Sequence, residues 1–435
     1  MKMHRLFAGM AAAVLAAGMM ALPASASEAP QQFNYTAVTG GTAQYSKYLV
    51  MDSDAVCPAV SFSYSIAVGA AAKATDSDHI DVYAGIGTPT VGTATFAQGA
   101  ATTAGAEGDG ITGASGAGSA DEKYATSTFT VDFSSVSFPE PGVYRYVITE
   151  TTPTGAFSAR STPLARTLDV YVKDVLDGTT HKLAVDSYVM YDKVIDTAFA
   201  KTNTISAEAD PNTTTYTVST TGNKTTAYVN DYSTVDLGFS KAVDGNQASR
   251  DKFFKFTVTI TNAPGAAVTV GGNYTAAPTK NSATEYTTAV MTAANTITDA
   301  VADVDGLQLA ADSNGTITHD FYLQNGQSIT LTGLPKGASY TITEDKEDYV
   351  PSVALTGDTK TGDAADEGTA IATNSATITD TYLKEDTTAA FTNTRQGTIP
   401  TGVVIPTAVP VAAGAALLGG VIVITVKRNR RKTEE

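Results

Sequence analysis

Two lysines stand at positions where a strand pattern calls for an apolar side chain. In the segment VDLGFSKAVDG, Lys241 shares a face with Leu237 and Phe239, because alternate residues of a strand point the same way. In the segment YSKYLV, Lys47 shares a face with Tyr45 in the same manner. An isolated buried charge is costly, so each lysine must be paired or neutral.

A glutamate and an asparagine accompany each lysine in the same order along the chain. Glu150 and Glu344 each continue an alternation of apolar residues, in GVYRYVITE and GASYTITE. Asn230 in AYVNDY and Asn393 in AFTNT also lie on the apolar side of their segments. One such residue alone is usually solvated, but two sets in the order Lys, Glu, Asn indicate that the three residues of each set act together. We therefore expect all six side chains to be buried.

Burial gives a set of these three residue types a specific reactivity. Desolvation makes a lysine lose its proton more easily and makes a glutamate keep its proton. A neutral amine beside an asparagine amide is a nucleophile facing an electrophile, and a protonated glutamate can hydrogen-bond the amide oxygen as charge develops there. Attack expels ammonia and leaves an uncharged Lys–Asn isopeptide bond.

Short strands separated by turns must position these residues. The 435 residues are rich in Thr, Val, Ala and Gly, include 20 Tyr and no Trp, and show no clear amphipathic helical repeat between the two ends. This composition favours strands. A weak internal repeat divides the chain, and we expect an all-β protein with two β-sandwich domains at about 27–232 and 233–396.

Four segments between the expected strands carry turn or loop signals. Asn314-Gly315 and Asn325-Gly326 bracket an apolar segment and predict hairpin turns. Residues 97–120 are rich in Ala and Gly and predict a mobile loop. Residues 203–226 read as a polar insertion with room for one hairpin.

The two ends of the chain carry targeting signals. Residues 1–26 contain a basic start, an apolar run and an Ala-Ser-Ala site, which predict a secretory signal peptide. Residues 403–426 are apolar, long enough for a transmembrane helix, and are followed by a basic tail. With Ile399-Pro400-Thr401-Gly402 just before them, residues 397–435 resemble the cell-wall sorting signal of Gram-positive surface proteins. In that signal a sortase cuts between the threonine and the glycine and joins the threonine carboxyl to an amine.

Composition argues against several classes of function. The 44 Asp and Glu outnumber the 28 Lys and Arg, giving a formal net charge of −16, and a surface of this sign repels nucleic acid. Cys57 is the only cysteine, so an intramolecular disulfide is excluded, and the four His are scattered. No motif of the sequence indicates a metal site, a cofactor or a turnover enzyme.

The segments around the six residues resemble those of the streptococcal FctA-type major (backbone) pilins. The similar segments, which keep their order over most of residues 40–402, are FTVDFSSVSFPEPGVYRYVITE, YVNDYSTVDLGFSKAVDG, DFYLQNGQSITLTGLPKGASYTITED and AAFTNTRQGTIPTGV. The resemblance implies that each domain is an immunoglobulin-like (CnaB-like) sandwich closed by a self-formed isopeptide bond. The implied bonds are Lys47–Asn230 with Glu150 as the catalytic residue and Lys241–Asn393 with Glu344. Asn203, in the insertion, is a weaker competitor for the first bond.

The same resemblance implies how subunits would be joined. The carboxyl donor is Thr401 after cleavage before Gly402. The acceptor in the family is a lysine shortly upstream of the first bonding asparagine, and Lys224 is the best match. Lys193 and Lys201 remain alternatives.

The sequence therefore predicts a structural protein: the shaft subunit of a sortase-assembled pilus on a Gram-positive cell wall. Its partners would be copies of itself, a pilin-specific and a housekeeping sortase, and minor tip or base pilins or a host surface as further candidates. A monomeric wall-anchored adhesin with similar sandwich domains is the alternative, and it would lack an acceptor lysine. A surface hydrolase, which should have acids or histidines clustered around a cleft, is disfavoured because the histidines are scattered.

Overall fold

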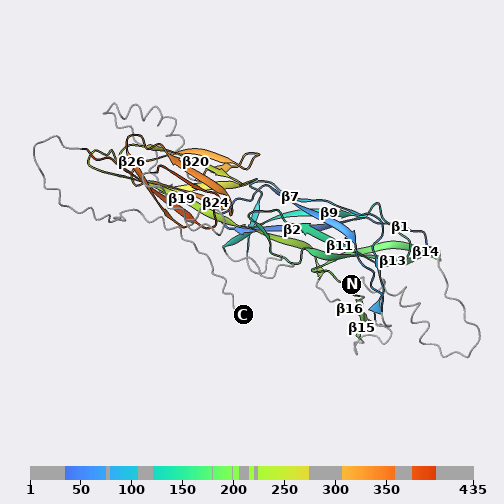
Figure 1. Cartoon of the computed structure of the whole chain (residues 1–435). Coiled ribbons are helices and arrows are strands. Elements are labelled where there is room, and N and C mark those ends of the chain that lie inside the picture. The colour runs from blue at the N-terminus through green and yellow to red at the C-terminus, as the bar shows by residue number, and fades with distance from the viewer. Residues whose placement is uncertain are drawn as a thin grey trace, which may run out of the picture.

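The chain folds into strands in all regular elements of the described ranges. The computed structural model describes residues 35–74, 79–105, 121–178, 180–197, 199–204, 215–219, 224–273, 306–357 and 375–397. The predicted all-β class with β-sandwiches is confirmed, and Figure 1 shows two groups of strands arranged end to end. The predicted signal peptide, the sorting signal and the apolar run 403–426 lie outside these ranges. Within them, no helix has the length and hydropathy needed to cross a bilayer.

Strands β1 to β18 form the first sandwich and two small separate sheets, β1-β10 and β16-β15-β4. Their bounds are β1 Val38–Thr39, β2 Thr42–Asp52, β3 Val60–Val68, β4 His79–Ile80, β5 Val82–Ala84, β6 Thr90–Val91, β7 Ala94–Phe96, β8 Thr102–Ala104, β9 Glu122–Asp132, β10 Ser137–Phe138, β11 Gly142–Thr151, β12 Phe157–Ala159, β13 Ala165–Asp177, β14 Thr180–Tyr191, β15 Phe199–Thr204, β16 Thr215–Ser219, β17 Lys224–Thr225 and β18 Ala227–Tyr232. One main sheet has the order β17-β14-β13-β11-β3-β7, and the other has the order β12-β18-β2-β9-β6.

The second sandwich repeats this plan with fewer strands. Their bounds are β19 Thr234–Asp244, β20 Phe254–Thr261, β21 Ala267–Asn273, β22 Gln308–Ala310, β23 Ile317–Leu323, β24 Ser328–Pro335, β25 Ser339–Glu344, β26 Val350–Thr356, β27 Thr377–Asp380 and β28 Thr387–Thr394. One sheet has the order β22-β21-β24-β19-β28-β26 and the other β23-β20-β25-β27. No described strand of one sandwich pairs with a strand of the other.

Alternation along the strands explains why these segments form sandwiches. In β20 every second side chain is buried, and the residues between are half-buried threonines and a lysine. The buried set of β20 includes Phe254 and Phe256, which pack in one apolar core with Phe239, Phe321 and Phe391 from neighbouring strands. Aromatic and β-branched side chains fit such a half-buried pleated surface well.

The two Asn-Gly pairs form turns, but the predicted hairpins are wrong. Gly315 and Gly326 have positive φ angles of 73° and 84°, as the turn signal requires. However, β23 pairs with β20, whereas β22 and β24 both pair with β21 in the facing sheet. The turns therefore carry the chain from one sheet to the other and do not join hydrogen-bonded neighbours.

Each sandwich brings its lysine-bearing strand beside its last strand. In the first, β2 runs parallel to β18, and in the second, β19 runs parallel to β28. Parallel neighbours need a long connection, and here nearly the whole sandwich forms that connection. A covalent link between these two strands would therefore close almost the entire chain of its sandwich into one loop.

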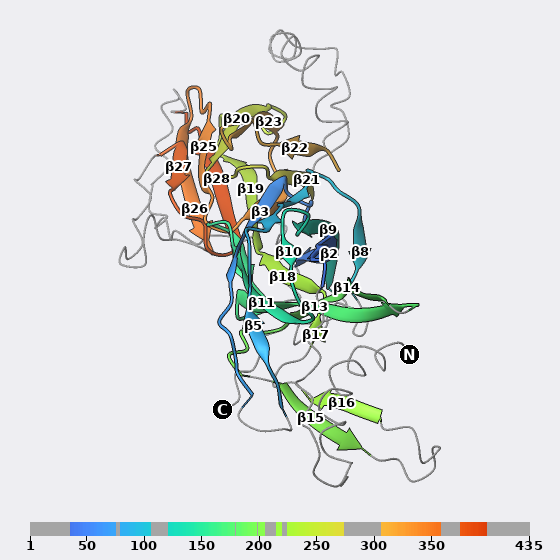
Figure 2. The ribbon, with the colours of Figure 1, turned by 90° about the vertical axis from the view of Figure 1, so that its right-hand side faces the viewer.

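Turns of the two sandwiches contact one another where the chain passes from β18 to β19. Ala59 N donates to Gly265 O at 2.8 Å, and Gln98 Nε2 donates to Ala266 O at 2.7 Å. Gly265 has a φ of 68°, and a Cβ there would lie 2.1 Å from the Ala59 carbonyl oxygen. A glycine is therefore required for this close contact. Figure 2 shows the molecule from the end at which the first sandwich lies.

A carboxyl group at this junction has a perturbed pKa. Burial raises the pKa of Asp236 from 3.8 to about 7, against the hydrogen bond that Gly333 N donates to Oδ1 at 3.1 Å. The carboxylates of Asp54, Asp386 and Asp52 raise it further. Because both sandwiches contribute these acids, ionisation of Asp236 adds repulsion across the contact.

We expect Asp236→Asn to change how stability depends on pH. A raised folded pKa means that Asp236 holds a proton in the folded chain that it releases in the unfolded chain between about pH 4 and 7, so the contribution of Asp236 to the free energy of unfolding falls through that window. The variant lacks this titration. Its melting temperature relative to wild type should rise by about 2 °C or more from pH 4 to 7, and then stay level.

Calorimetry over this pH range, with Asp251→Asn at an exposed position as the matched control, measures the difference. A constant offset between Asp236→Asn and wild type at every pH would contradict the proposed titration.

Candidate functional site

The structure gathers the six residues that the sequence singles out into two trios. All six are buried, with exposed fractions of 3% or less. The first trio is Lys47 on β2, Glu150 on β11 and Asn230 on β18, and the second is Lys241 on β19, Glu344 on β25 and Asn393 on β28. In both sandwiches the lysine and the asparagine come from neighbouring strands of one sheet, and the glutamate comes from the facing sheet.

Strand register gives the two trios the same internal geometry. Lys47 pairs with Tyr228 on β18, and Lys241 pairs with Phe391 on β28. In each case the asparagine lies two residues beyond the partner of the lysine, and therefore on the same face of the sheet. The amine and the amide are diagonal neighbours inside the core.

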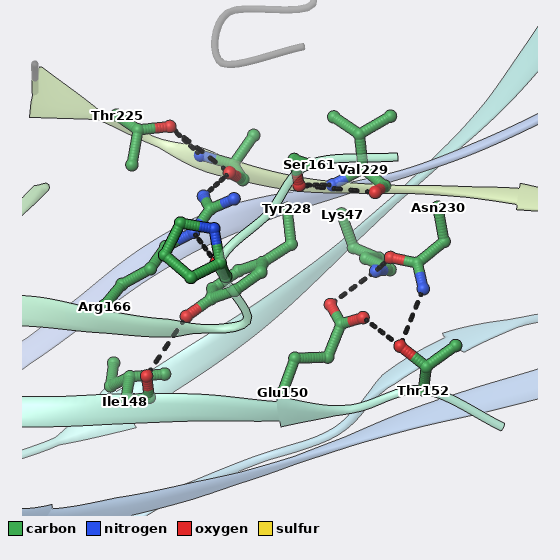
Figure 3. Close-up of polar contacts among 12 residues, drawn as sticks. Lys47, Ile148, Glu150, Thr152, Ser161, Arg166, Thr225, Tyr228, Val229 and Asn230 are labelled. Carbon is green, nitrogen blue, oxygen red and sulfur yellow. Dashed lines mark hydrogen bonds and ion pairs between the residues drawn. The ribbon is translucent and has the colours of Figure 1, made fainter. Parts of the chain in front are cut away.

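The first trio is a closed network of polar contacts (Figure 3). Lys47 Nζ donates to Glu150 Oε2 at 2.5 Å and also to Asn230 Oδ1. Asn230 Nδ2 donates to Thr152 Oγ1 at 3.1 Å, and Thr152 Oγ1 donates to Glu150 Oε1 at 3.3 Å. The network places the amine against both the acid and the amide.

Burial sets the electrostatics of the first trio. Desolvation lowers the pKa of Lys47 to about 8, although the carboxylate of Glu150 opposes the shift. A second cation, Arg166, acts in the same direction as burial. Its guanidinium lies 4.0 Å from the centre of the Tyr228 ring and donates to Ala227 O at 2.6 Å. A neutral amine is therefore accessible at a pH only slightly above neutral.

In the second trio no hydroxyl of a described residue bridges the glutamate and the asparagine. Lys241 Nζ lies 2.5 Å from Glu344 Oε1, and Asn393 Nδ2 donates to the same oxygen at 2.9 Å. Burial lowers the pKa of Lys241 to about 8 and raises the pKa of Glu344, while each residue opposes the shift of the other. Burial thus favours the neutral amine and the neutral acid together.

The amide of Asn393 does not make the hydrogen bond that the sequence argument assumed. We expected the glutamate to contact the amide oxygen, but Glu344 accepts from Nδ2, and Asn393 Oδ1 is buried without a hydrogen-bond partner among the described residues. An ionised carboxylate only accepts, so it takes the amide N–H. When Glu344 is protonated it becomes a donor, and a half-turn of the amide about its Cβ–Cγ bond would offer it Oδ1.

Sequence reasoning missed an aromatic ring beside each lysine. Lys47 Nζ lies 4.0 Å from the centre of the Phe62 ring, and Lys241 Nζ lies 4.4 Å from that of Phe254. Phe62 lies on β3, which pairs with β11, the strand of Glu150. Phe254 lies on β20, which pairs with β25, the strand of Glu344. The alternating aromatics in SFSYS and KFFKF were the available signal. These rings keep water away from the amines.

The candidate acceptor lysines lie away from the trios. Lys224 is exposed on β17, a two-residue edge strand in which Thr225 is buried and Tyr191 of β14 is the partner of Lys224. Lys193 is also exposed, and its carbonyl oxygen accepts from Thr167 N at 3.0 Å. Lys201 lies on β15.

The donor and competitor residues are placed differently. Thr401 and Gly402 lie outside the described residues. Asn203 lies on β15 in the sheet β16-β15-β4, which is separate from the sheets that hold the first trio. Across the described ranges, no group of three or more His, Cys, Asp or Glu is placed to hold a metal ion.

Comparisons of the sequence with known proteins find one family model and a curated relative. Residues 235–395, which contain the second trio, match a family described as a domain of unknown function (DUF7601). A segment of 114 residues is 35% identical to a protein named pilin from Streptococcus pyogenes serotype M1. Part of the chain is thus similar in sequence to a streptococcal pilin. The resemblance to these pilins is confirmed to that extent. The match covers 26% of this chain and 32% of the relative, so this chain aligns with about a third of the curated relative's length.

Comparisons of the fold return pilin structures of the same species. A crystal structure of the major pilin from Streptococcus pyogenes covers 83% of this chain and 100% of its own, with 21% identity and a TM-score of 0.46. A second major pilin protein of that species covers 82% and 100%, with 17% identity and a TM-score of 0.43. At these identities and TM-scores, the similarity of fold does not indicate a function.

Proposed function

We propose that this chain is the major shaft subunit of a covalent surface pilus, with one self-formed Lys–Asn isopeptide bond in each of two sandwich domains, 27–232 and 233–396. The observation that carries the proposal is the repeated trio, with the same two-residue offset and the same division between facing sheets. The partial similarity to a streptococcal pilin supports the biological setting. The protein would be structural, without turnover, metal or cofactor.

The geometry supports the following chemistry in each trio. The lysine passes a proton to the glutamate, and the neutral amine then attacks the amide carbon of the asparagine. Charge develops on the amide oxygen, and in the second trio a protonated Glu344 would stabilise it by donating a hydrogen bond once the amide has turned. One proton from the amine ends on the departing nitrogen, which leaves as ammonia. The Cγ–Nζ bond that forms replaces a buried ion pair with an uncharged amide.

Assembly would use the two ends of the chain. The signal peptide 1–26 would direct export, and a sortase would cut between Thr401 and Gly402 while the span 403–426 holds the precursor in the membrane. The threonine carboxyl would then be joined to Lys224 of a second copy, and a housekeeping sortase would attach the polymer to the cell wall. Minor pilins at the tip or base and a host surface are further partners of this proposal.

A monomeric wall-anchored adhesin is the second candidate. It is favoured only by the features that both functions share, namely the trios and the sorting signal. An exposed lysine on an ordered edge strand is what a polymer needs in addition, and Lys224 provides one. Formation of a ladder of covalent polymers with the cognate sortase separates the two candidates.

The mass of the processed protein tests the internal bonds. We expect an intact mass about 34 Da below the value calculated from the processed sequence, because each bond releases one ammonia of about 17 Da. Peptide mapping should find the two cross-linked pairs, Lys47 with Asn230 and Lys241 with Asn393. A mass equal to the calculated value would rule out both bonds.

A further inference from the structure

The two trios differ in how the glutamate reaches the leaving nitrogen. In the first, Glu150 uses both oxygens: Oε2 accepts from Lys47 Nζ, and Oε1 accepts from the hydroxyl of Thr152. That hydroxyl in turn accepts from Asn230 Nδ2, the atom that must depart (Figure 3). Among the described residues, this hydroxyl therefore connects Glu150 to the leaving nitrogen.

The second trio makes the same link directly. Lys241 Nζ and Asn393 Nδ2 both contact Oε1 of Glu344, and Oε2 of Glu344 is buried without a hydrogen-bond partner among the described residues. Two residues after Glu344 the chain has Lys346, where the first sandwich has Thr152 after Glu150. The second trio therefore connects its glutamate to the amide nitrogen directly, whereas the first does so through a hydroxyl.

Expulsion of the amide nitrogen depends on a proton. An amide nitrogen in its planar form donates hydrogen bonds and does not accept them. Once the amine has attacked, the carbon is tetrahedral and the nitrogen has a basic lone pair. It must gain one proton before it leaves as ammonia, because an amide anion is a very poor leaving group.

We propose that Thr152 relays this proton from Glu150 to the leaving nitrogen of Asn230. This inference rests on the proposed isopeptide chemistry. Glu150 first takes one proton from Lys47 at Oε2, and a half-turn of its carboxyl then brings that proton to the side of Thr152. In the tetrahedral intermediate this O–H gives its proton to Thr152 Oγ1, and the hydroxyl proton of Thr152 moves to Nδ2. The carboxyl oxygen that now faces Lys47 takes the second proton that Nζ must lose. The Cγ–Nδ2 bond breaks with its electron pair on nitrogen, so Thr152 ends with its hydroxyl and Glu150 ends as the neutral acid that it was before the attack.

The hydrogen bonds of the resting state fit this relay because they reverse along the same path. Before attack, Asn230 Nδ2 donates to Thr152 Oγ1, and Oγ1 donates to Glu150 Oε1. After attack, the carboxyl of Glu150 donates to Oγ1, and Oγ1 donates to Nδ2. A hydroxyl can donate and accept at once, so it needs only to rotate. Thr152 follows the last residue of β11, two positions from Glu150, which keeps its hydroxyl at the edge of the trio.

Substitution of Thr152 by Val and by Ser tests the relay. Valine keeps the shape and removes the hydroxyl, serine keeps the hydroxyl, and Thr151→Val at the exposed neighbouring position is the matched control. The full-length chain is made by cell-free synthesis, and peptide mapping at successive times follows both bonds in the same molecules. The Lys241–Asn393 bond is the internal control, because its formation shows that the chain has folded and that the isopeptide reaction proceeds.

We expect Thr152→Val to slow formation of the Lys47–Asn230 bond by about 10-fold or more, as loss of a proton-transfer group does. Thr152→Ser and Thr151→Val should form it at close to the wild-type rate, and the Lys241–Asn393 bond should form normally in every variant. A wild-type rate for the first bond in Thr152→Val would overturn the relay, as would equal slowing in Thr152→Ser. Absence of both bonds from the wild type would instead overturn the proposed function, and the relay with it.

Discussion

Lys241→Met should lower the free energy of unfolding of the second sandwich by about 5 kcal/mol, because the variant cannot form the proposed Lys241–Asn393 bond, which would close a loop of about 150 residues. This figure treats the isopeptide like a disulfide, whose stabilisation in the chain-entropy account comes from restricting the unfolded chain. In a domain of this size the loss corresponds to a fall of about 10 °C or more in melting temperature. Calorimetry and the rate of trypsin digestion measure it.

Methionine is chosen because it separates loss of the bond from stranding of a charge. It fills the space of the lysine stem with apolar atoms, and burial already raises the pKa of Glu344, so that this residue can stay neutral without its partner. Lys255→Met is the control, since Lys255 is a half-exposed lysine of the same sandwich paired with Asp320. Its effect should be under about 1 kcal/mol. Equal melting temperatures for Lys241→Met and Lys255→Met would contradict a covalent bond at Lys241.

Local alternation was enough to identify the six residues of the trios. A strand has a period of two, so a polar residue that falls in step with buried neighbours is itself buried, as Lys47 and Lys241 are. The order Lys, Glu, Asn in both halves then linked residues that are far apart in sequence. The all-β fold class followed from composition in the same way.

Contacts that depend on the pairing of distant strands could not be predicted. Phe62 and Phe254 reach the amines only because β3 and β20 pair with the glutamate strands, and no local pattern states that pairing. Thr152 follows the end of its strand, where alternation no longer specifies a face. The Asn-Gly turns failed for a related reason, since a turn signal gives the backbone conformation but not the sheet that the next strand joins.

The position of the acceptor would decide which of the two proposed internal bonds carries load in a polymer. If force enters at Lys224 and leaves at Thr401, the loaded chain runs through β18 and β19, crosses from Lys241 to Asn393, and continues to the end. The proposed Lys241–Asn393 bond would then shield the whole second sandwich from tension. The proposed Lys47–Asn230 bond would lie beside this path and hold β18 in its sheet, because Asn230 is itself on the loaded segment.

Lys224→Arg should abolish the ladder of SDS-resistant polymers while leaving the internal bonds and the folded monomer intact. Arginine keeps the positive charge and the exposed position on β17, but its guanidinium stays protonated and cannot serve as the acceptor amine. The measurement is electrophoresis of cell-wall extracts, or of the purified protein incubated with its sortase, together with the intact mass of the monomer. We expect a single monomer band with the same ammonia loss as the wild type.

Lys193→Arg provides the matched control, because Lys193 is an exposed lysine two residues beyond Tyr191, the β14 partner of Lys224. It should leave the ladder unchanged. An undiminished ladder in Lys224→Arg would reject this acceptor, and loss of the ladder in Lys193→Arg alone would move the assignment to Lys193. Either lysine lies between Lys47 and Asn230 in sequence, so the load path through the second bond is the same for both. Lys224 differs from Lys193 in lying only six residues before Asn230. A bond between subunits at Lys224 would therefore be separated from the proposed Lys47–Asn230 bond only by β17 and the first half of β18.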